Sequence, residues 1–454
     1  MDYNAELFIK LYSKMALALG VTPSPAPVSS DPDMVEVIEL GGPVRRSSVP
    51  NQETKYLLGI YNPGQFIPAD MNPLDKDDLY ALSVLLDVVP QFSWVFKPAS
   101  TTVSNTYHSI LECKDMPLTE LTPEEKKKLE TAQETMTKYE EEYYEYQGLY
   151  FEALDAYDVA YAEQENGGPS VPRSVKEKVK SALQRWRAHH KEAYESAVAV
   201  TYQYEALEPA SFWDKLAQRY ESGTQKSKSG VDFQVMGFSP PYKSWFQDAG
   251  WTKFTFDQKD MDNQKTSDVI GVAGKLEGDF GLFKVSGDGK YQEDSKFEKV
   301  KETSLYFSCE LMRVSLDRFW MNPLVFHSSA WRWRSGTPFY GTLLSDGGDI
   351  SGEVAPKGAM TVIPTAFILS RKLEIKGTFQ DTLVDELNRE IDANASVGIG
   401  PFNINGKVNI GHHESRAKGS IASNHIEAKD VQIIAMVCEV LSKCPDPDNT
   451  LPWP

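Results

Sequence analysis

Few of the residue combinations that carry catalysis in other proteins occur in this sequence. It contains no Gly-x-Ser-x-Gly nucleophile elbow and no Gly-x-x-x-x-Gly-Lys-[Ser/Thr] phosphate-binding loop. The Gly-Lys pairs that begin at Gly274, Gly289 and Gly406 each lack the upstream glycine that such a loop requires. No Gly-x-Gly-x-x-Gly run follows a predicted strand. The sequence therefore predicts no catalytic residues, and an enzyme of unrecognised type is kept only as an alternative.

The best candidate for metal binding is the run His412-His413-Glu414 together with His425. Imidazole nitrogens and carboxylate oxygens are ligands that zinc accepts. Adjacent residues on a strand point to opposite faces, however, so His412 and His413 would not share one ion. The loop from Asp346 to Glu353 lacks the ligand spacing of a calcium-binding loop. The sequence therefore predicts no metal site and no cofactor.

Composition indicates a globular protein that does not bind nucleic acid. The chain has 454 residues, of which 41% are hydrophobic and 25% charged, a length typical of two or three domains. Its formal net charge of −18 repels phosphate backbones. Of the four cysteines, Cys438 and Cys444 lie six positions apart, so they could form a disulfide only in an oxidising compartment; free thiols are the simpler interpretation.

The first twenty residues predict a helix rather than a secretory signal. Asp2, Glu6, Lys10 and Lys14 interrupt any apolar core that a signal peptide would need. No run of about 18 apolar residues occurs elsewhere. We therefore expect synthesis in the cytoplasm without a signal peptide, and an amphipathic helix over residues 1–20. Its expected apolar face comprises Leu7, Phe8, Leu11, Met15 and Leu19.

Residues 118–208 are predicted to form a long antiparallel helical hairpin, preceded by a loop-rich mixed region over residues 34–117. Apolar and tyrosine residues recur at steps of three and four from Leu129 to Tyr161, which is typical of one helix face. Capping boxes are predicted at Thr122 and Ser174, one before each helix. We expect the seam between the two helices to contain Tyr143, Tyr150, Tyr157 and Trp186.

From residue 231 to residue 444 the chain is predicted to form a β domain built from a duplicated unit, with copies over about 250–318 and 361–444. Gly281 to Gly287 matches Gly400 to Gly406, and Lys253 to Phe256 matches Lys372 to Ile375 at the same offset. Apolar residues alternate with polar ones beyond both glycines. The candidate residues for assembly or membrane contact on this face are Gly281, Phe283, Val285, Gly287 and Tyr291 in the first copy, and Gly400, Phe402, Ile404, Gly406, Val408 and Ile410 in the second.

Two further features accompany the repeat. The alternation changes phase at Gly281 and Gly400, which predicts a glycine bulge or turn in each copy. Each copy then ends in an apolar strand with a Cys-Glu pair, at Cys309 and at Cys438. We therefore expect Gly281 to superpose on Gly400 and Gly287 on Gly406.

The run Trp331-Arg332-Trp333-Arg334 lies between the two copies. On a strand, both tryptophans would share one face and both arginines the other. Tryptophan and arginine are frequent anchors of protein interfaces. Trp331 and Trp333 are therefore candidates for a subunit contact, with a place in the core of the chain as the alternative.

The order of elements in residues 250–441 resembles that of the membrane attack complex/perforin and gasdermin-type pore-forming proteins. Phe339-Tyr340-Gly341-Thr342-Leu343 is similar to the perforin-type signature [YW]-G-[TS]-H-[FY], but it departs from that signature where the histidine should be, because Leu343 stands there. Gly347-Gly348 follows, as a glycine pair does in that family. The resemblance implies a bent sheet in which two segments each leave a core strand, return to the next, and later become membrane hairpins.

The sequence as a whole predicts an α+β protein with a long antiparallel helical hairpin and a C-terminal β domain built from a duplicated β unit. The favoured function is self-association as a homo-oligomer without catalysis, with membrane insertion and pore formation implied by the resemblance. The amphipathic strands suit a barrel wall and a half-exposed sheet equally well. A structural or partner-binding assembly protein that never enters a membrane therefore stays as an alternative.

Overall fold

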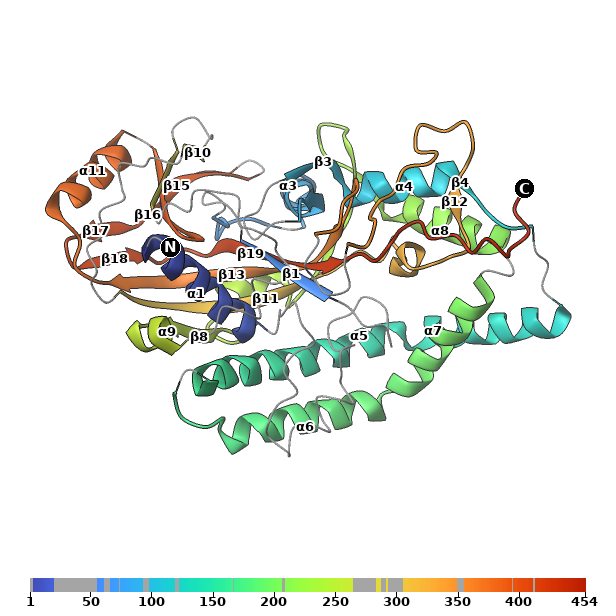
Figure 1. The fold of residues 1–454 in the computed structure, drawn as a ribbon, viewed down its shortest axis with the longest axis horizontal. Coiled ribbons are helices and arrows are strands. Elements are labelled where there is room, and N and C mark those ends of the chain that lie inside the picture. Colours follow the sequence, from blue (N-terminus) through green and yellow to red (C-terminus); the bar gives the residue numbers. More distant parts are fainter. Residues whose placement is uncertain are drawn as a thin grey trace.

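Helices and antiparallel strands are grouped in separate parts of this chain, which confirms the predicted α+β class (Figure 1). The structure is a computed structural model. It describes residues 3–19, 55–60, 66–72, 74–92, 98–118, 122–165, 167–205, 209–263, 283–286, 291–292, 305–348, 355–393, 395–410 and 413–454.

A bent main sheet forms the centre of the molecule. Strands β8 (Thr252–Phe256), β11 (Tyr306–Asp317), β13 (Val362–Lys376) and β19 (Gln432–Val440) pair in that order, each antiparallel to the next. Strand β1 (Lys55–Ile60) borders β19. Shorter strands complete the sheet: β7 (Gly237–Ser239), β17 (Ser420–Ala422) and β18 (His425–Ala428). Side chains from both halves of the chain therefore meet in one core.

Irregular pairing bends the long strands of this sheet. Between β11 and β13 the register shifts where Cys309 faces Leu373 and Lys372. Lys372 has a φ of +52°, a left-handed backbone conformation that costs a non-glycine residue about 1–2 kcal/mol. Between β13 and β19 the register shifts twice more, near Thr365 and near Ile434. Bulges of this kind bend a strand and increase its local twist.

A second sheet lies beside the first and contains strands from both predicted copies. Its order is β10 (Tyr291–Gln292), β9 (Phe283–Ser286), β14 (Ser396–Ile399), β15 (Phe402–Ile410) and β16 (His413–Lys418). Strands β9 and β15, which carry the matched sequences, lie on either side of β14 and are both antiparallel to it. Strand β14 thus joins the two matched sequences in one sheet.

The glycine predictions have different outcomes. Gly400 has a φ of +53° and begins the two-residue turn between β14 and β15, so the predicted turn at this position is confirmed. Gly281 and Gly287 lie outside the described residues, and so does their expected superposition on Gly400 and Gly406. The strands with Cys-Glu pairs, β11 and β19, occupy equivalent places on the two sides of β13.

Helix α1 (Tyr3–Ala18) is buried more completely than an amphipathic helix would be. The predicted apolar face is buried, but Ile9, Tyr12 and Ala16 are buried as well. The reason is that α1 contacts α5 and α9 (Gln258–Asn263) and also packs on the core of the main sheet. The prediction of one exposed polar face is therefore wrong, although the helix itself is confirmed.

The predicted helical hairpin is formed by α5 (Pro123–Glu165), α6 (Arg173–Ala188) and α7 (Lys191–Glu205), with α5 between the sheet and α6 (Figure 1). Thr122 and Glu125 exchange hydrogen bonds as a capping box does, which confirms that prediction. The second predicted capping box is wrong. Helix α6 begins earlier, because the carbonyl of Pro172 accepts the first hydrogen bonds, from the Val175 and Lys176 amides.

The seam of this hairpin contains the predicted aromatic residues. Tyr143, Tyr150, Tyr157 and Trp186 are all buried. The ring of Trp186 lies 5.2 Å from that of Tyr143 and 5.5 Å from that of Tyr150, measured between centroids. The hairpin is thus held by its own aromatic layer, as the stripe predicted. A feature not predicted is the break of the second helix at His189 and His190, where His190 has a φ of +64°.

A separate apolar core lies at the end of the molecule opposite α11 (Asp381–Asp392) (Figure 1). It is built from α4 (Val103–Cys113), α8 (Pro209–Gly223) and the pair β4 (Lys114–Asp115) and β12 (Arg332–Trp333). The remaining elements are α3 (Lys76–Asp87), β2 (Val88–Pro90), β3 (Pro98–Thr102), β5 (Thr224–Lys226), β6 (Asp232–Gln234), and the 3-10 helices η1 (Tyr242–Phe246) and η3 (Pro323–Phe326).

Candidate functional site

Two long segments interrupt the main sheet, and they contain most of the candidate residues. The first segment, residues 257–305, leaves after β8 and returns to its neighbour β11. The second segment, residues 377–431, leaves after β13 and returns to its neighbour β19. Each segment begins near a helix, α9 in the first and α11 in the second, and both contribute strands to the second sheet.

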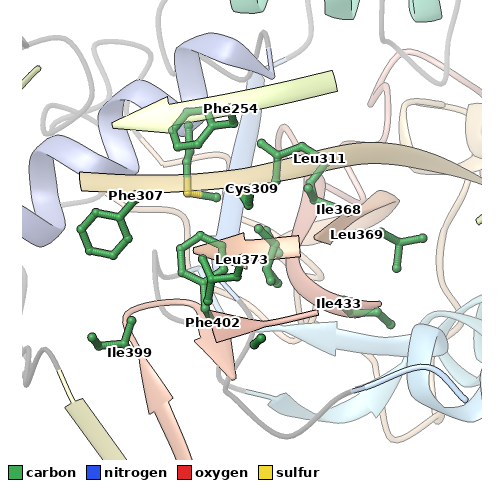
Figure 2. Close-up of a cluster of buried hydrophobic side chains, with 14 of the residues drawn as sticks. Phe254, Phe307, Cys309, Leu311, Ile368, Leu369, Leu373, Ile399, Phe402 and Ile433 are labelled. Atoms are coloured by element: carbon green, nitrogen blue, oxygen red, sulfur yellow. The ribbon is translucent and has the colours of Figure 1, made fainter. Parts of the chain in front are cut away.

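The apolar face of the second segment packs into the core of the chain. Ile399, Phe402 and Ile404 are buried. Figure 2 shows Ile399 and Phe402 among side chains of β11 and β13, and the ring centroid of Phe402 lies 6.4 Å from that of Phe307. These three side chains are therefore covered by their own chain in the present conformation, without a neighbouring subunit or lipid.

The opposite face at the start of β15 is buried as well, which the alternating pattern did not predict. The Asn403 amide donates to Gln432 Oε1 at 2.7 Å, and Gln432 Nε2 donates back to the Asn403 carbonyl at 3.2 Å. Asn405 Nδ2 donates to the Ala395 carbonyl at 3.3 Å. Asn403 and Asn405 are therefore buried even though Asn403 Oδ1 has no hydrogen-bond partner among the described residues, so polar side chains here do not mark a solvent face.

The remaining candidates on the strands are placed by backbone pairing alone. Phe283 faces Ile399 and Val285 faces Val397 in the β9–β14 pair, and Tyr291 faces Ser286 in the β10–β9 pair. Val408 and Ile410 pair with Ser415 and His413.

Gly406 lies where the sheet meets a loop from the N-terminal region. A Cβ atom at this position would lie 3.1 Å from Ser396 Oγ and 3.5 Å from Phe66 Cε2. Phe66 itself forms a bridge with Gln432 of β19. Gly406 therefore lies in close contact with a segment of the same chain.

Trp331 and Trp333 are core residues of this chain. Both are buried, with their rings 5.1 Å apart in an edge-to-face arrangement. Trp331 Nε1 donates to the Val325 carbonyl at 2.7 Å, and Trp333 stacks on Phe339. Neither tryptophan is available as an anchor on the surface, so their interpretation as a subunit contact is wrong and the alternative holds.

The part of the chain that is similar to the perforin-type signature forms a series of turns. Tyr340 is 62% exposed, and Gly341 has a φ of +76°. Gly347 has a φ of +82°, and a Cβ atom there would lie 2.9 Å from the Lys443 amide nitrogen. The glycine pair thus lets this loop approach the chain that follows β19. The Ser345 hydroxyl, which donates to the Leu441 carbonyl, adds to this contact.

A buried ion pair fastens the start of the first segment to α1. Lys14 Nζ lies 2.8 Å from Asp260 Oδ1 and 2.9 Å from Asp260 Oδ2, and both side chains are almost fully buried. Lys10 on the same helix donates to the Met261 carbonyl. Burial raises the pKa of Asp260, while the hydrogen bond from Lys14 opposes that rise. Removal of either partner would leave a buried charge without compensation.

A second polar cluster fastens the hairpin of β15 and β16 to the N-terminal region. His413 Nδ1 lies 3.2 Å from Asp70 Oδ2, and His413 Nε2 lies 3.0 Å from Asp78 Oδ2. The hydrogen bond to Asp78 is the main reason that the pKa of His413 is raised above its ordinary value. His413 was considered as a metal ligand from the sequence; the structure instead surrounds it with carboxylates. No pattern in the sequence indicates these partners, which lie more than 300 residues away.

Comparison with known proteins does not place the chain in a family. No family model matches it, no curated protein matches its sequence, and no solved structure matches its fold. Within the ranges that the structure describes, no helix is long and apolar enough to cross a membrane, and no group of three metal-binding side chains could hold an ion. All four cysteines are free thiols.

Proposed function

We propose that this protein acts by self-association, and that it does so by releasing two segments of its main sheet into a membrane. In this proposal the segments over residues 257–305 and 377–431 form β hairpins that join those of neighbouring copies. Catalysis plays no part in it. The final barrel would be homo-oligomeric, with apolar side chains toward lipid and polar side chains toward its interior.

The connectivity of the main sheet carries this proposal. Each segment starts at one strand and ends at the adjacent antiparallel strand, β8 with β11 and β13 with β19. An extended hairpin in place of either segment would therefore continue two neighbouring strands without breaking their pairing. The same connectivity is implied by the resemblance to perforin-type proteins, and the bulges that bend β13 agree with the bent sheet of that family.

Because the apolar face is buried, the proposal requires the two segments to leave the core before they enter a membrane. Phe402 and Ile404 are covered by the core of their own chain, so the present conformation is one in which the segments are stored. The same burial favours the alternative, an assembly protein whose segments stay folded and whose contacts lie elsewhere. Membrane leakage separates the two functions.

The pairing of β9 with β14 offers a direct test, because it joins the two segments to each other. Ser286 faces Ser396 in this antiparallel pair, and such partners have Cα atoms about 4.5–5.5 Å apart, within the range of a disulfide. The double variant Ser286→Cys/Ser396→Cys should lock the segments together when oxidised. We expect the oxidised protein to lose the ability to release dye from liposomes, and reduction with dithiothreitol to restore it.

The two single-cysteine variants are the matched controls, because they carry the same substitutions without the crosslink. Leakage by these controls and by the wild type should be unchanged by oxidation. Electron microscopy with lipid should show ring-shaped oligomers for the wild type, the controls and the reduced double variant, and none for the oxidised double variant. A wild-type protein that stays monomeric with and without lipid would overturn the proposal, and assembly without leakage would support the alternative.

A further inference from the structure

One contact between distant parts of the chain depends on the charge of a single imidazole. His413 is the first residue of β16 and pairs with Ile410, so it lies at the tip of the β15–β16 hairpin. Its two ring nitrogens face two different carboxylates, those of Asp70 and Asp78. A neutral imidazole has one N–H group, whereas the protonated ring has two. Both contacts are hydrogen bonds only when His413 is protonated.

Asp78 depends on this contact more than Asp70 does. Its exposed fraction is 3%, and its Oδ2 atom also accepts a hydrogen bond from the Asn72 amide at 2.8 Å. Its Oδ1 atom has no hydrogen-bond partner among the described residues. A buried carboxylate with so few partners is destabilised when its cation is removed. Loss of the proton from His413 therefore weakens the attachment of the hairpin at its buried end.

We propose that His413, Asp70 and Asp78 form a pH-sensitive latch that holds the β15–β16 hairpin against α3 and releases its tip as the pH rises. Only the role of the latch rests on the proposed function: it would keep the second segment in its folded position. Helix α3 stays in place when the latch opens, because Leu82 and Leu86 anchor it in the core. The hairpin tip is the part that moves.

The other ionisable groups around the latch keep their charge while imidazole titrates. Lys228, from the turn after β5, bonds to Asp75 at the start of α3, and this hydrogen bond raises the pKa of Lys228. Tyr242 of η1 donates to the Pro68 carbonyl, and burial raises the pKa of its hydroxyl. Both groups therefore hold their protons through the neutral range, and Lys228 also lies near Asp77. Among the described ionisable groups that surround the latch, His413 is therefore the one that changes charge there.

The direction of the pH effect follows from the raised pKa of His413. A group whose pKa is higher in the closed state adds stability that is complete below its ordinary pKa of 6.5. That stability is lost as the pH rises through the raised pKa. The latch is therefore closed under mildly acidic conditions and opens toward alkaline pH, and each unit of pKa shift changes the opening constant about tenfold.

Hydrogen exchange of the monomeric protein tests the latch without any membrane. We expect protection of amides in β15 and β16 to fall as the pH rises above the ordinary histidine pKa of 6.5, after correction for the intrinsic rate, because His413 then loses its proton. His413→Gln should remove this pH dependence and leave the hairpin open throughout. Amides in β11 and β13 should keep their protection in both proteins, which shows that the chain is still folded.

The matched control is His425→Gln, because His425 lies in the same segment and also bonds to a carboxylate, Glu427, at 2.7 Å. This control should keep the pH-dependent protection of β15 and β16. Equal pH dependence in the wild type and in His413→Gln would overturn the latch, whatever the leakage assay shows. A working latch in a protein that never releases liposome dye would support the latch and refute the proposed membrane function.

Discussion

The helical hairpin and the main sheet bury their aromatic side chains by different means. In the hairpin, the partners Tyr143 and Trp186 are about 40 residues apart and belong to helices joined by a short connection. In the sheet, β1 pairs with β19 across most of the length of the chain, and Phe307 lies near Phe402 from the other copy. The hairpin thus follows from local periodicity, whereas the sheet requires partners that no local pattern specifies.

The largest effect is expected in the hairpin, from Trp186→Ala. Trp186 is buried between Tyr143 and Tyr150, so its removal leaves a cavity in a seam that the chain cannot easily close. We expect a loss of about 3–5 kcal/mol in the free energy of unfolding, measured in urea. Leu149→Ala, at an exposed position on α5, is the control and should cost about 0.5 kcal/mol or less. Equal effects would mean that the seam does not stabilise the hairpin.

The next largest loss of stability is expected from Lys14→Met, beside the main sheet. This substitution removes the cation that pairs with Asp260. The loss should be about 3 kcal/mol at neutral pH, because a buried carboxylate is left without its partner. Burial already raises the pKa of Asp260, and without Lys14 it should rise further. Protonation then relieves the buried charge, so the difference from the wild type should shrink as the pH falls.

Lys259→Met, on the exposed side of α9, is the control for this prediction. It removes the same charge from α9, the helix that contains Asp260, without touching Asp260, and its effect should be small and nearly independent of pH. If Lys14→Met and Lys259→Met gave the same pH profile, the buried pair would not be the contact that fastens the first segment.

The third prediction is that glycine-to-alanine substitutions change the stability of the protein in opposite directions in the two regions. Gly148 lies inside α5, and a Cβ atom there would be 3.5 Å from Ser239 Oγ, an ordinary contact. Gly148→Ala should stabilise the protein by about 0.5–1 kcal/mol, because alanine favours a helix interior. Gly400→Ala has room as well, but its φ of +53° should make it destabilising by about 1–2 kcal/mol. Thermal unfolding of both variants checks the signs.

The sequence could predict what depends on spacing along the chain. The stripe from Leu129 to Tyr161 placed the hairpin seam correctly, and the change of phase at Gly400 placed a turn. Alternation along β15 was misleading, because Asn403 and Asn405 are buried and form hydrogen bonds to Gln432 and Ala395 inside the protein. Period-two patterns assume that a polar side chain faces water, and a buried amide network breaks that assumption.

The contacts of the candidate site were harder to predict from the sequence than the seam of the hairpin. Trp331 and Trp333 have the composition of an interface but fill a core, since composition does not say which chain provides the covering surface. The partners of His413 and of Lys14 come from segments hundreds of residues distant, so spacing could not reveal either contact. Long-range ion pairs of this kind follow from the fold and not from a motif.

The smallest effect is expected at the bend of the main sheet, from Lys372→Asn. Lys372 lies in the bulge of β13 with a φ of +52°, and asparagine tolerates this left-handed conformation better than lysine does. The substitution also removes a half-exposed ion pair with Glu310, at 3.1 Å. Lys376→Asn on the same strand is the matched control, because it removes a similar ion pair, with Glu374 at 3.2 Å, and has no positive φ. Lys372→Asn should therefore be more stable than Lys376→Asn by about 0.5 kcal/mol in urea unfolding. The opposite order would mean that the ion pair between Lys372 and Glu310 stabilises the protein by more than the backbone strain at Lys372 costs. The ion pair would then stabilise the bend of the sheet.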